Sequence, residues 1–534
     1  MSEVADIFNR VSRLKSDRGS WESHWEEIAE VVLPRYKDSF IGQAYVNTKG
    51  DKRTQKMFDA TAALGLERFA SVMESMLVPR NQKWHFLKAS DEALNRDRET
   101  RLWFDAVTDI LFKQRYTPKA NYASQQNEVF MGLGAFGTGV MFLDQMAEGG
   151  IRYKANHLGG IYFAENHQGI VDTVYREFHL TARQILQKFD NERVPESIHK
   201  IAEKTPEQTF EIVHCVKPNM ERDEARSDFK GMEFKSIYVT KEGNSILEEG
   251  GYNTFPYVVS RYVTAPGEIY GRSPAMTALP SIKTLNEQKK TVLKQGHRVV
   301  DPVLLMHDDG IANTFSMRPG AANAGGVSAE GRALVQTMPT GNLSAGFEMM
   351  NQEREVINDV FLVNLFQILT DSPQMTATEV LERTREKGML LSPTMGRQQT
   401  EALSPMIERE LDILMRQGLL PPMPRQLLEA EGEFEIQYDS PLSRAQRAEE
   451  ATGLFRSLEF ATNYANVSGD PSVFDYFNMD EAIPELMRIN AVPERWKRAD
   501  KEIKGIRQGR QEQAQQQQAI EAAPAQAQLI GAAK

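Results

Sequence analysis

The sequence has 534 residues, of which 41% are hydrophobic and 26% charged, and its formal net charge is -11. This is the composition of a soluble globular protein, and a chain of this length is expected to form about three or four domains. The negative net charge argues against a protein that binds nucleic acid over its whole surface. The single cysteine, Cys215, excludes an intramolecular disulfide and a CxxC metal site.

No signal peptide opens the chain, and its most apolar run, residues 356–369, is broken by polar residues. That run is also shorter than the roughly 20 residues that a membrane span needs, so we expect an intracellular protein with no membrane partner. The histidines are scattered, and Cys215 beside His214 is interpreted as a buried strand residue rather than a metal or thiol site.

The first 115 residues are predicted to be mainly helical. Residues 20–34 have tryptophans and aliphatic residues on one face, with Ser20 as the N-cap and Pro34 as the stop. Further helical patterns lie at residues 58–80, 99–116 and 121–133.

Gly132, Gly134 and Gly137 have the G-x-G-x-x-G spacing of a dinucleotide-binding loop. Such a loop must follow a strand and open a helix, because the phosphate lies on the helix N-terminus. Here the glycines follow a helical pattern and precede the β-branched, apolar residues 138–144. We therefore interpret them as a helix end and a tight turn.

Residues 138–263 are rich in predicted strands with short turns, interrupted by one helix at residues 181–189, and favour antiparallel sheets. A long helix is predicted next, at residues 273–300, with a possible kink or later start at Pro280. At 1.5 Å per residue it would be about 40 Å long. It carries a mostly basic stripe and a thin apolar line at heptad spacing. The stripe is Lys283, Glu287, Lys290, Lys294 and Arg298, and the apolar line is Leu285, Val292 and Val299.

A Gly-, Ala- and Asn-rich insertion at residues 301–342 separates this helix from a second one, at residues 343–369. This order predicts an antiparallel helix pair with a small β module at its tip. A loop at residues 370–376 then leads into a helix that starts with a Thr376–Glu379 capping box and is kinked at prolines on its way to Gln417. One strand near residues 432–440, helices at residues 441–509 and a Gln/Ala-rich tail complete the chain, and the tail is expected to be a frayed helix or disordered.

Four stretches match a known family in its order: "DATAALGLERFASVMESMLVP", "GLGAFGTGVMFL", "YGRSPAMTALPSIKTLNEQKK" and "MTATEVLERTREKG". They are spread over most of residues 10–440. On these residues the chain resembles the portal proteins, or head-to-tail connectors, of short-tailed double-stranded DNA phages. The C-terminal hundred residues carry little of the resemblance.

The resemblance implies an α+β portal fold with a wing, a two-helix stem, a clip, a helical crown and a closed ring of about twelve copies. It maps onto the chain as wing 1–272 and 377–440, stem 273–300 and 343–369, clip 301–342, tunnel loop 370–376, crown 441–509 and tail 510–534.

The resemblance also implies a function, as a channel at one capsid vertex through which duplex DNA is packaged and ejected. The expected partners are the major capsid protein, a terminase motor, and the tail adaptor and tail proteins. The expected location is the virion, with the host cytoplasm as the place of assembly. Neither a cofactor nor a catalytic activity is expected, since the chain has no Walker motif G-x-x-x-x-G-K-[ST].

Two groups of residues are candidates for contact with DNA in the tunnel. The first group is the cations of the basic stripe: Lys283, Lys290, Lys294 and Arg298. They could instead form a solvated helix face. The second group is the tunnel loop: Asp371, Ser372, Pro373, Gln374 and Met375. It could instead be an ordinary connection between two helices. Two other functions stay open: an internal virion or scaffold protein without a channel, and a nucleotide-binding enzyme of the cytosol.

Overall fold

The computed structural model describes most of the chain, and its described residues form two compact units. The described residues are 3–40, 53–306, 316, 318, 320–323, 326–339, 341–363, 393–430, 433–439, 441–489, 492, 496–498 and 502–515. The first unit takes residues 3–78, 118–363 and 393–413 of these, and the second takes residues 79–117 and 414–515. Both mix helices and strands, so the predicted α+β class is confirmed.

The first unit is built on a five-stranded antiparallel sheet in the order β4-β5-β6-β7-β8. Its strands are β4 (Ile161–Glu165), β5 (Val171–Thr181), β6 (Thr209–Pro218), β7 (Phe234–Thr240) and β8 (Ser245–Tyr252). Helix α1 (Glu3–Asp17) buries Val4, Ile7 and Val11 against one face of this sheet, where Cys215 lies fully buried. Two short helices, α6 (Ala182–Lys188) and α7 (Glu196–Lys204), pack with other sheet residues in a second core cluster.

A three-stranded sheet, β3-β2-β9, carries the glycine-rich stretch. Its strands are β2 (Thr138–Gln145), β3 (Ile151–Asn156) and β9 (Tyr257–Arg261). Helix α5 (Tyr122–Phe136) packs against β2 and β3, and α2 (Gly19–Val31) and α3 (Thr61–Leu77) pack against α5. The predicted helix-then-strand order at the glycines is confirmed.

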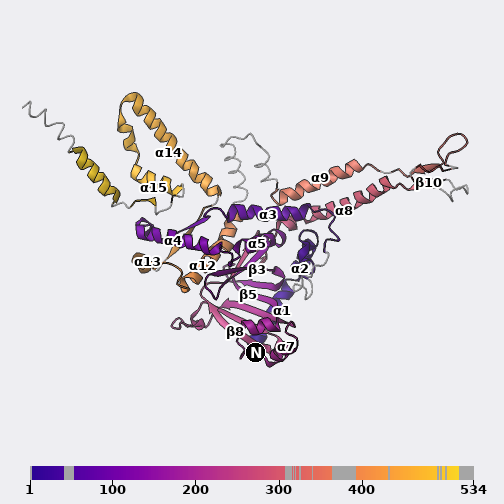
Figure 1. Cartoon of the computed structure of the whole chain (residues 1–534), viewed down its shortest axis with the longest axis horizontal. Helices are drawn as coiled ribbons and strands as arrows, with labels where there is room; N and C mark the ends of the chain where they lie inside the picture. Colours follow the sequence, from indigo (N-terminus) through magenta and orange to yellow (C-terminus); the bar gives the residue numbers. More distant parts are fainter. Residues whose placement is uncertain are drawn as a thin grey trace, which may run out of the picture. The chain divides into compact units, whose positions relative to one another are not determined.

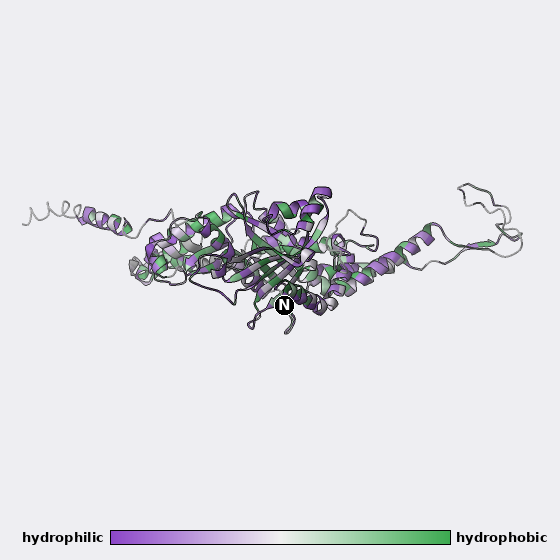
Figure 2. Ribbon diagram, turned by 90° about the horizontal axis from the view of Figure 1, so that it is seen from below, coloured by the Kyte–Doolittle hydropathy of each residue, from purple (hydrophilic) through white to green (hydrophobic). Residues whose placement is uncertain are grey.

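Two long helices of this unit run side by side (Figure 1). They are α8 (Pro274–Val300) and α9 (Leu343–Val360), and the pair is antiparallel because Gln295, near the end of α8, bonds to Gly341, just before α9. Between them lies a two-stranded sheet of β10 (Leu304–Met306) and β11 (Val335–Thr337). The predicted helix pair with a small β module is confirmed. Figure 2 shows hydrophobic and hydrophilic residues interleaved along the pair.

The helix that the sequence predicts to be kinked is described from residue 393 onward. It contains a π-helical turn, Gln399–Leu403, directly before α12 (Ser404–Arg416). Pro405 cannot donate a backbone hydrogen bond, which accounts for a local change of helical register at this point. Arg261 and Glu401 form an ion pair at 2.9 Å that fixes this turn against β9.

The second unit is centred on an antiparallel strand pair, β1 (His85–Ala89) with β12 (Phe434–Tyr438). Helix α4 (Arg98–Arg115) packs against β1. The other helices are α13 (Arg425–Glu429), α14 (Pro441–Ser468), α15 (Met479–Ile489) and a helical stretch at residues 502–515. The helices expected at residues 441–509 are thus confirmed where the structure describes them.

Two expectations about local structure are wrong, and three elements were not predicted. Ser20 is not an N-cap, because α2 starts at Gly19 and follows α1 after Arg18, whose backbone is already helical. The second long helix, expected to run unbroken from residue 343 to 369, is interrupted after Val360, and residues 364–369 lie outside the described part of the chain. At the interruption Phe361 is fully buried against Gly65 of α3, and Leu362 takes a left-handed backbone with φ of 61°. The sequence patterns also missed β1, α7 and β8.

Candidate functional site: the outer half of the long helix pair

The inner end of α8 is fixed to α5 by the Ser-Pro start that the sequence suggested. Ser273 caps the helix by accepting a hydrogen bond from the Met276 N–H at 3.0 Å, and its hydroxyl donates to the Ala135 carbonyl at 2.8 Å. The helix runs without interruption through Pro280. Its first half is buried, which anchors the root of the pair in the first unit.

The glycine motif serves this packing. Gly137 ends α5 with a left-handed φ of 77°, and a side chain there would meet the Gly271 carbonyl at 2.1 Å. A side chain at Gly134 would approach Leu66 and Phe69 to within 2.6 and 2.7 Å. The hollow beside Gly132 measures about 110 Å³, well below the roughly 300 Å³ or more of an ordinary cofactor site. The motif therefore gives no support to a nucleotide-binding enzyme.

A second anchor joins the root of the pair to the segment before α3. The Asn286 side-chain oxygen accepts the N–H groups of Phe58 at 2.9 Å and Asp59 at 3.1 Å. Arg354 of α9 forms an ion pair with Asp59 at 2.7 Å. Burial alone would raise the pKa of Asp59, but hydrogen bonds from Thr61 and Arg354 outweigh it and leave that pKa lowered. Both helices are therefore held at Asp59, α8 through the backbone N–H of this residue and α9 through its carboxylate.

The basic stripe divides into an inner and an outer half. Lys283 forms an ion pair with Glu27 of α2, and Lys290 pairs with Glu287 at 3.1 Å on its own helix. Within the described residues, Lys294 and Arg298 form no ion pair, and both line a hollow at the outer end of α8. The inner cations are therefore partly neutralised, whereas the outer two keep their charge available.

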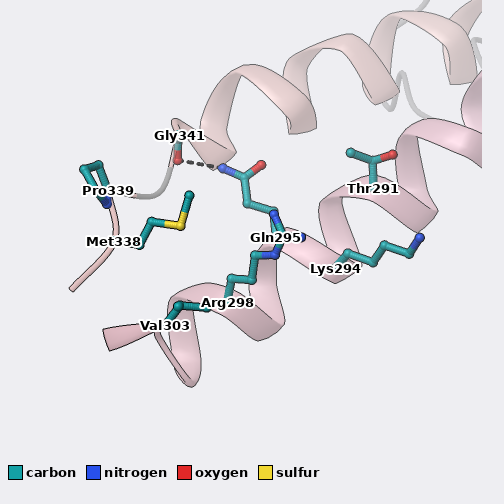
Figure 3. Close-up of a pocket in the computed structure, with 8 residues that line it drawn as sticks. All are labelled: Thr291, Lys294, Gln295, Arg298, Val303, Met338, Pro339 and Gly341. Atoms are coloured by element: carbon teal, nitrogen blue, oxygen red, sulfur yellow. Dashed lines mark hydrogen bonds between the residues drawn. The ribbon is translucent and has the colours of Figure 1, made fainter. Parts of the chain in front are cut away.

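The hollow has a volume of about 280 Å³. It is lined by Thr291, Lys294, Gln295, Arg298, Val303, Met338, Pro339 and Gly341. The Gln295 side chain donates to the Gly341 carbonyl at 2.7 Å, and the Met338 N–H donates to the Val303 carbonyl at 2.8 Å. Figure 3 shows Gln295 reaching across to Gly341, while Lys294 points along α8 away from Met338. The hollow thus combines apolar surface with two cations.

The apolar residues of the pair form lines at heptad spacing. The inner lines become buried between the helices: Met350 and Ile357 of α9 are fully buried, and Val292 of α8 lies against Gly346. Leu285 is buried, but Val299 at the outer end is exposed. Leu293 and Val300 of α8, seven residues apart, form a second line that is exposed, as do Met349 and Val356 of α9.

Sequence reasoning found the outer cations but missed the rest of the hollow. Gln295, Val303 and Met338 come together only because β10 and β11 pair beyond the helices. The five tunnel-loop candidates, residues 371–375, lie outside the described residues, as does the capping box at Thr376 and Glu379. In the part of the chain that the structure describes, no group of three metal-ligating side chains occurs, and no helix is both long and apolar enough to cross a membrane.

Comparison with known proteins shows which family this chain belongs to. Residues 5–496 match the family of bacteriophage head to tail connecting proteins. The portal protein of Salmonella phage epsilon15 is 27% identical over 529 residues, which cover 97% of this chain and 93% of that protein. The probable portal protein of Bordetella phage BPP-1 is 28% identical over 490 residues, covering 89% and 85%. The resemblance drawn from the sequence is confirmed, and the chain belongs to the family of bacteriophage head to tail connecting proteins.

Proposed function

We propose that this chain is the subunit of a portal: a closed ring of about twelve copies at one capsid vertex, through which duplex DNA enters and leaves the head. The main observation that supports a ring is the exposed apolar residues along the two long helices. Val300 is 87% exposed, and Leu293, Met349 and Val356 are each about half exposed. Full burial of such a side chain contributes roughly 1.5–3 kcal/mol, so a second copy of the chain is a favourable cover for them.

The position of these residues suits a ring rather than a closed pair. Seven-residue spacing along both helices is the pattern of helices that pack on other helices. Phe347 is also half exposed, and it lies two residues before Met349, on the opposite side of the buried line of α9. A subunit in a head-to-tail ring needs two different contact faces, and exposed apolar residues on both flanks supply them.

The parts of the portal fold can be assigned to the chain as part of this proposal. Helices α8 and α9 form the stem, with α9 ending at Val360, and residues 301–342 form the clip. Residues 1–272 and 377–440 make up the wing, residues 370–376 the tunnel loop, residues 441–509 the crown, and residues 510–534 the tail. The small β module between the two long helices supports the clip assignment.

Lys294 and Arg298, which form no ion pair with any described residue, are the proposed contacts with passing DNA, with a smaller contribution from Lys290, which is paired with Glu287. A ring repeats each of them in every copy, while each copy keeps a net charge of -11. Neutralising 6–10 phosphates at once would give tight, salt-dependent binding, about 10³–10⁵-fold weaker at 200 than at 50 mM salt. A mostly acidic channel with a few cationic rings would instead damp DNA movement without holding it.

The remaining partners follow from the same proposal. The clip would receive a terminase motor during packaging and the tail adaptor afterwards, and the wing would contact the major capsid protein. We assign no reaction to the chain itself, since a separate motor would hydrolyse ATP. The ring would form in the host cytoplasm and remain in the virion.

Single-particle electron microscopy of the full chain, with native mass spectrometry, tests the ring. We expect a closed ring with a central opening wide enough for duplex DNA. A chain that stays monomeric or forms open assemblies at high concentration would contradict the portal and favour an internal virion or scaffold protein.

The cations are tested in particles. Lys294→Gln combined with Arg298→Gln should weaken the retention of packaged DNA, whereas Lys283→Gln should not, because Lys283 is already paired with Glu27. Equal retention in both variants and in the unmodified protein would contradict the assigned DNA contacts while leaving the ring intact.

A further inference from the structure

A row of polar and aromatic side chains crosses the five-stranded sheet of the first unit. The strand register places Arg176 of β5 opposite His214 of β6, and His214 opposite Tyr238 of β7. Residues directly opposite each other on neighbouring strands have their side chains on the same face of the sheet. The His214 and Tyr238 rings are stacked, with centroids 3.9 Å apart and an angle of 2° between their planes.

His214 at the centre of this row is fully buried and uncharged. Its Nδ1 atom lies 2.6 Å from the Tyr257 hydroxyl, and its Nε2 atom lies 2.9 Å from the Ser236 hydroxyl. Burial lowers the pKa of His214 well below its usual value, and the positive charges of Lys188 and Arg176 lower it further. The row therefore provides a neutral aromatic platform rather than a charge.

Two cations flank this platform from different elements. Lys188, the last residue of α6, has its ammonium 3.9 Å from the centroid of the Tyr238 ring. Arg176 lies opposite His214, with its guanidinium carbon 4.5 Å from the centroid of the Phe178 ring. Both positive charges are thus held beside the stacked rings. Arg176 also shares a hydrogen bond with the Tyr257 hydroxyl, so part of its guanidinium fork and the Lys188 ammonium are left for a ligand.

A third cation comes from the other sheet. Lys154 of β3 lies opposite Phe142 of β2, so the two side chains share a face of that sheet. The Phe142 ring lies 4.8 Å from the Tyr257 ring and 5.8 Å from the His214 ring. Lys154, Arg176 and Lys188, which we call the cation cluster, therefore surround the same neutral platform.

In the described part of the chain, no member of the cation cluster has a carboxylate oxygen within 4.0 Å. Several other cations of this unit are paired; Lys235, for example, binds Glu3 at 2.9 Å and Glu249 at 3.0 Å. In a chain with more carboxylates than cations, three unpaired cations from three separate elements are an unusual local excess of positive charge.

The excess of positive charge is reflected in the lowered pKa of two lysines of the cluster. Lys154 is exposed, yet partial desolvation and then the charges of Arg176, Lys188 and Arg152 lower the pKa of Lys154 to about 8. Desolvation lowers the pKa of Lys188 as well, and it outweighs the negative charges of Glu248 and Asp144, which alone would raise that pKa. Like charges that depress one another are relieved by a bound anion.

We propose that the cation cluster binds the oxyanion of a phosphate group. A phosphate has up to two negative charges and several acceptor oxygens, so it can serve one guanidinium and two ammonium groups together. The planar fork of Arg176 matches two of those oxygens, and the lysines act as point charges. The phosphate could come from free inorganic phosphate or from the backbone of DNA. This site is independent of the ring and of the stem.

Isothermal titration of the full chain with inorganic phosphate, at constant ionic strength and near-neutral pH, tests the site. Lys154→Gln and Lys188→Gln should each weaken binding about tenfold or more, since each removes a hydrogen bond to a charged group. Both side chains are exposed, so the fold should be kept, which thermal unfolding would verify. Lys200→Gln, an exposed lysine paired with Glu196, is the matched control and should bind as the unmodified chain does.

A second titration, with a short DNA duplex, separates the two sources. Saturable binding of phosphate that both cluster variants weaken supports the proposal with free phosphate as a ligand. Binding of the duplex alone, with the same dependence on Lys154 and Lys188, supports it with DNA as the source. The proposal is overturned if neither probe binds up to about 10 mM phosphate, or if the cluster variants bind as the Lys200→Gln control does.

Discussion

Removal of the exposed apolar line of α8 should break the ring without unfolding the subunit. The change is Leu293→Ser combined with Val300→Ser. Val300 is 87% exposed and Leu293 46% exposed in the isolated chain. Full burial of one such side chain is worth about 1.5–3 kcal/mol, so covering the exposed parts of both would contribute about 3 kcal/mol to each subunit contact. At about 1.4 kcal/mol per factor of ten, the double variant should weaken that contact about 100-fold.

The assay is sedimentation velocity over a range of protein concentrations, with thermal unfolding of the same samples. The double variant should shift from rings to monomers, and its unfolding temperature should change little, because most of the altered surface is already in water. Met220→Ser is the matched control, since Met220 is 93% exposed but lies on the loop between β6 and β7. Rings that persist in the double variant at the same concentrations as in the control would refute the assignment of this line to the subunit contact.

Three further predictions concern the subunit itself. Gly134→Ala should lower the free energy of unfolding by about 1–3 kcal/mol, because the added carbon meets Leu66 and Phe69 side chains, and chemical denaturation measures this; Gly19→Ala, with nothing within 4 Å, is the control. The pKa of Asp59 is lowered in the folded chain, so the contribution of Asp59 to stability is present above pH about 4 and is lost as the pH falls below that. The free energy of unfolding of Asp59→Asn should therefore depend less on pH in this acid range. An unchanged pH profile would contradict the role of Asp59 in anchoring the helix pair. Burial raises the pKa of the Cys215 thiol to about 12, so iodoacetamide should label it only after unfolding, as mass spectrometry would show, and rapid labelling of the folded chain would contradict its burial.

The elements that the sequence predicted well are those whose signals are local. The Ser273-Pro274 start, the run of helix formers behind it and the heptad spacing all belong to α8 itself, and α8 is found with nearly the predicted bounds. The glycines before β2 were also interpreted correctly, since helix-to-strand order is a local feature. By contrast, β1 becomes a strand by pairing with β12 at the far end of the chain, which no local pattern reveals.

The same distinction applies to the candidate site. Helical spacing correctly indicated that Lys283, Lys290, Lys294 and Arg298 lie along one helix, but spacing could not show which charges are neutralised. The partner of Lys283 is Glu27, more than 250 positions earlier in the sequence. The end of α9 is a similar case, because the packing of Phe361 against Gly65 coincides with a break at residues 361–362 that the local helical pattern does not predict.

In an acidic chain, the cations that remain unpaired are more informative than those that form ion pairs. Arg354 is paired with Asp59, and its contacts account for how the helix pair is fixed to the first unit. Lys294 and Arg298 have no such partner among the described residues, although leaving a cation unpaired forgoes a favourable contact. In a ring, their charges would be repeated in every copy, where an intermittent contact with DNA requires them to be free. The cation cluster follows the same logic, since Lys188 and Arg176 are held beside aromatic rings and none of its three cations has a carboxylate oxygen within 4.0 Å among the described residues.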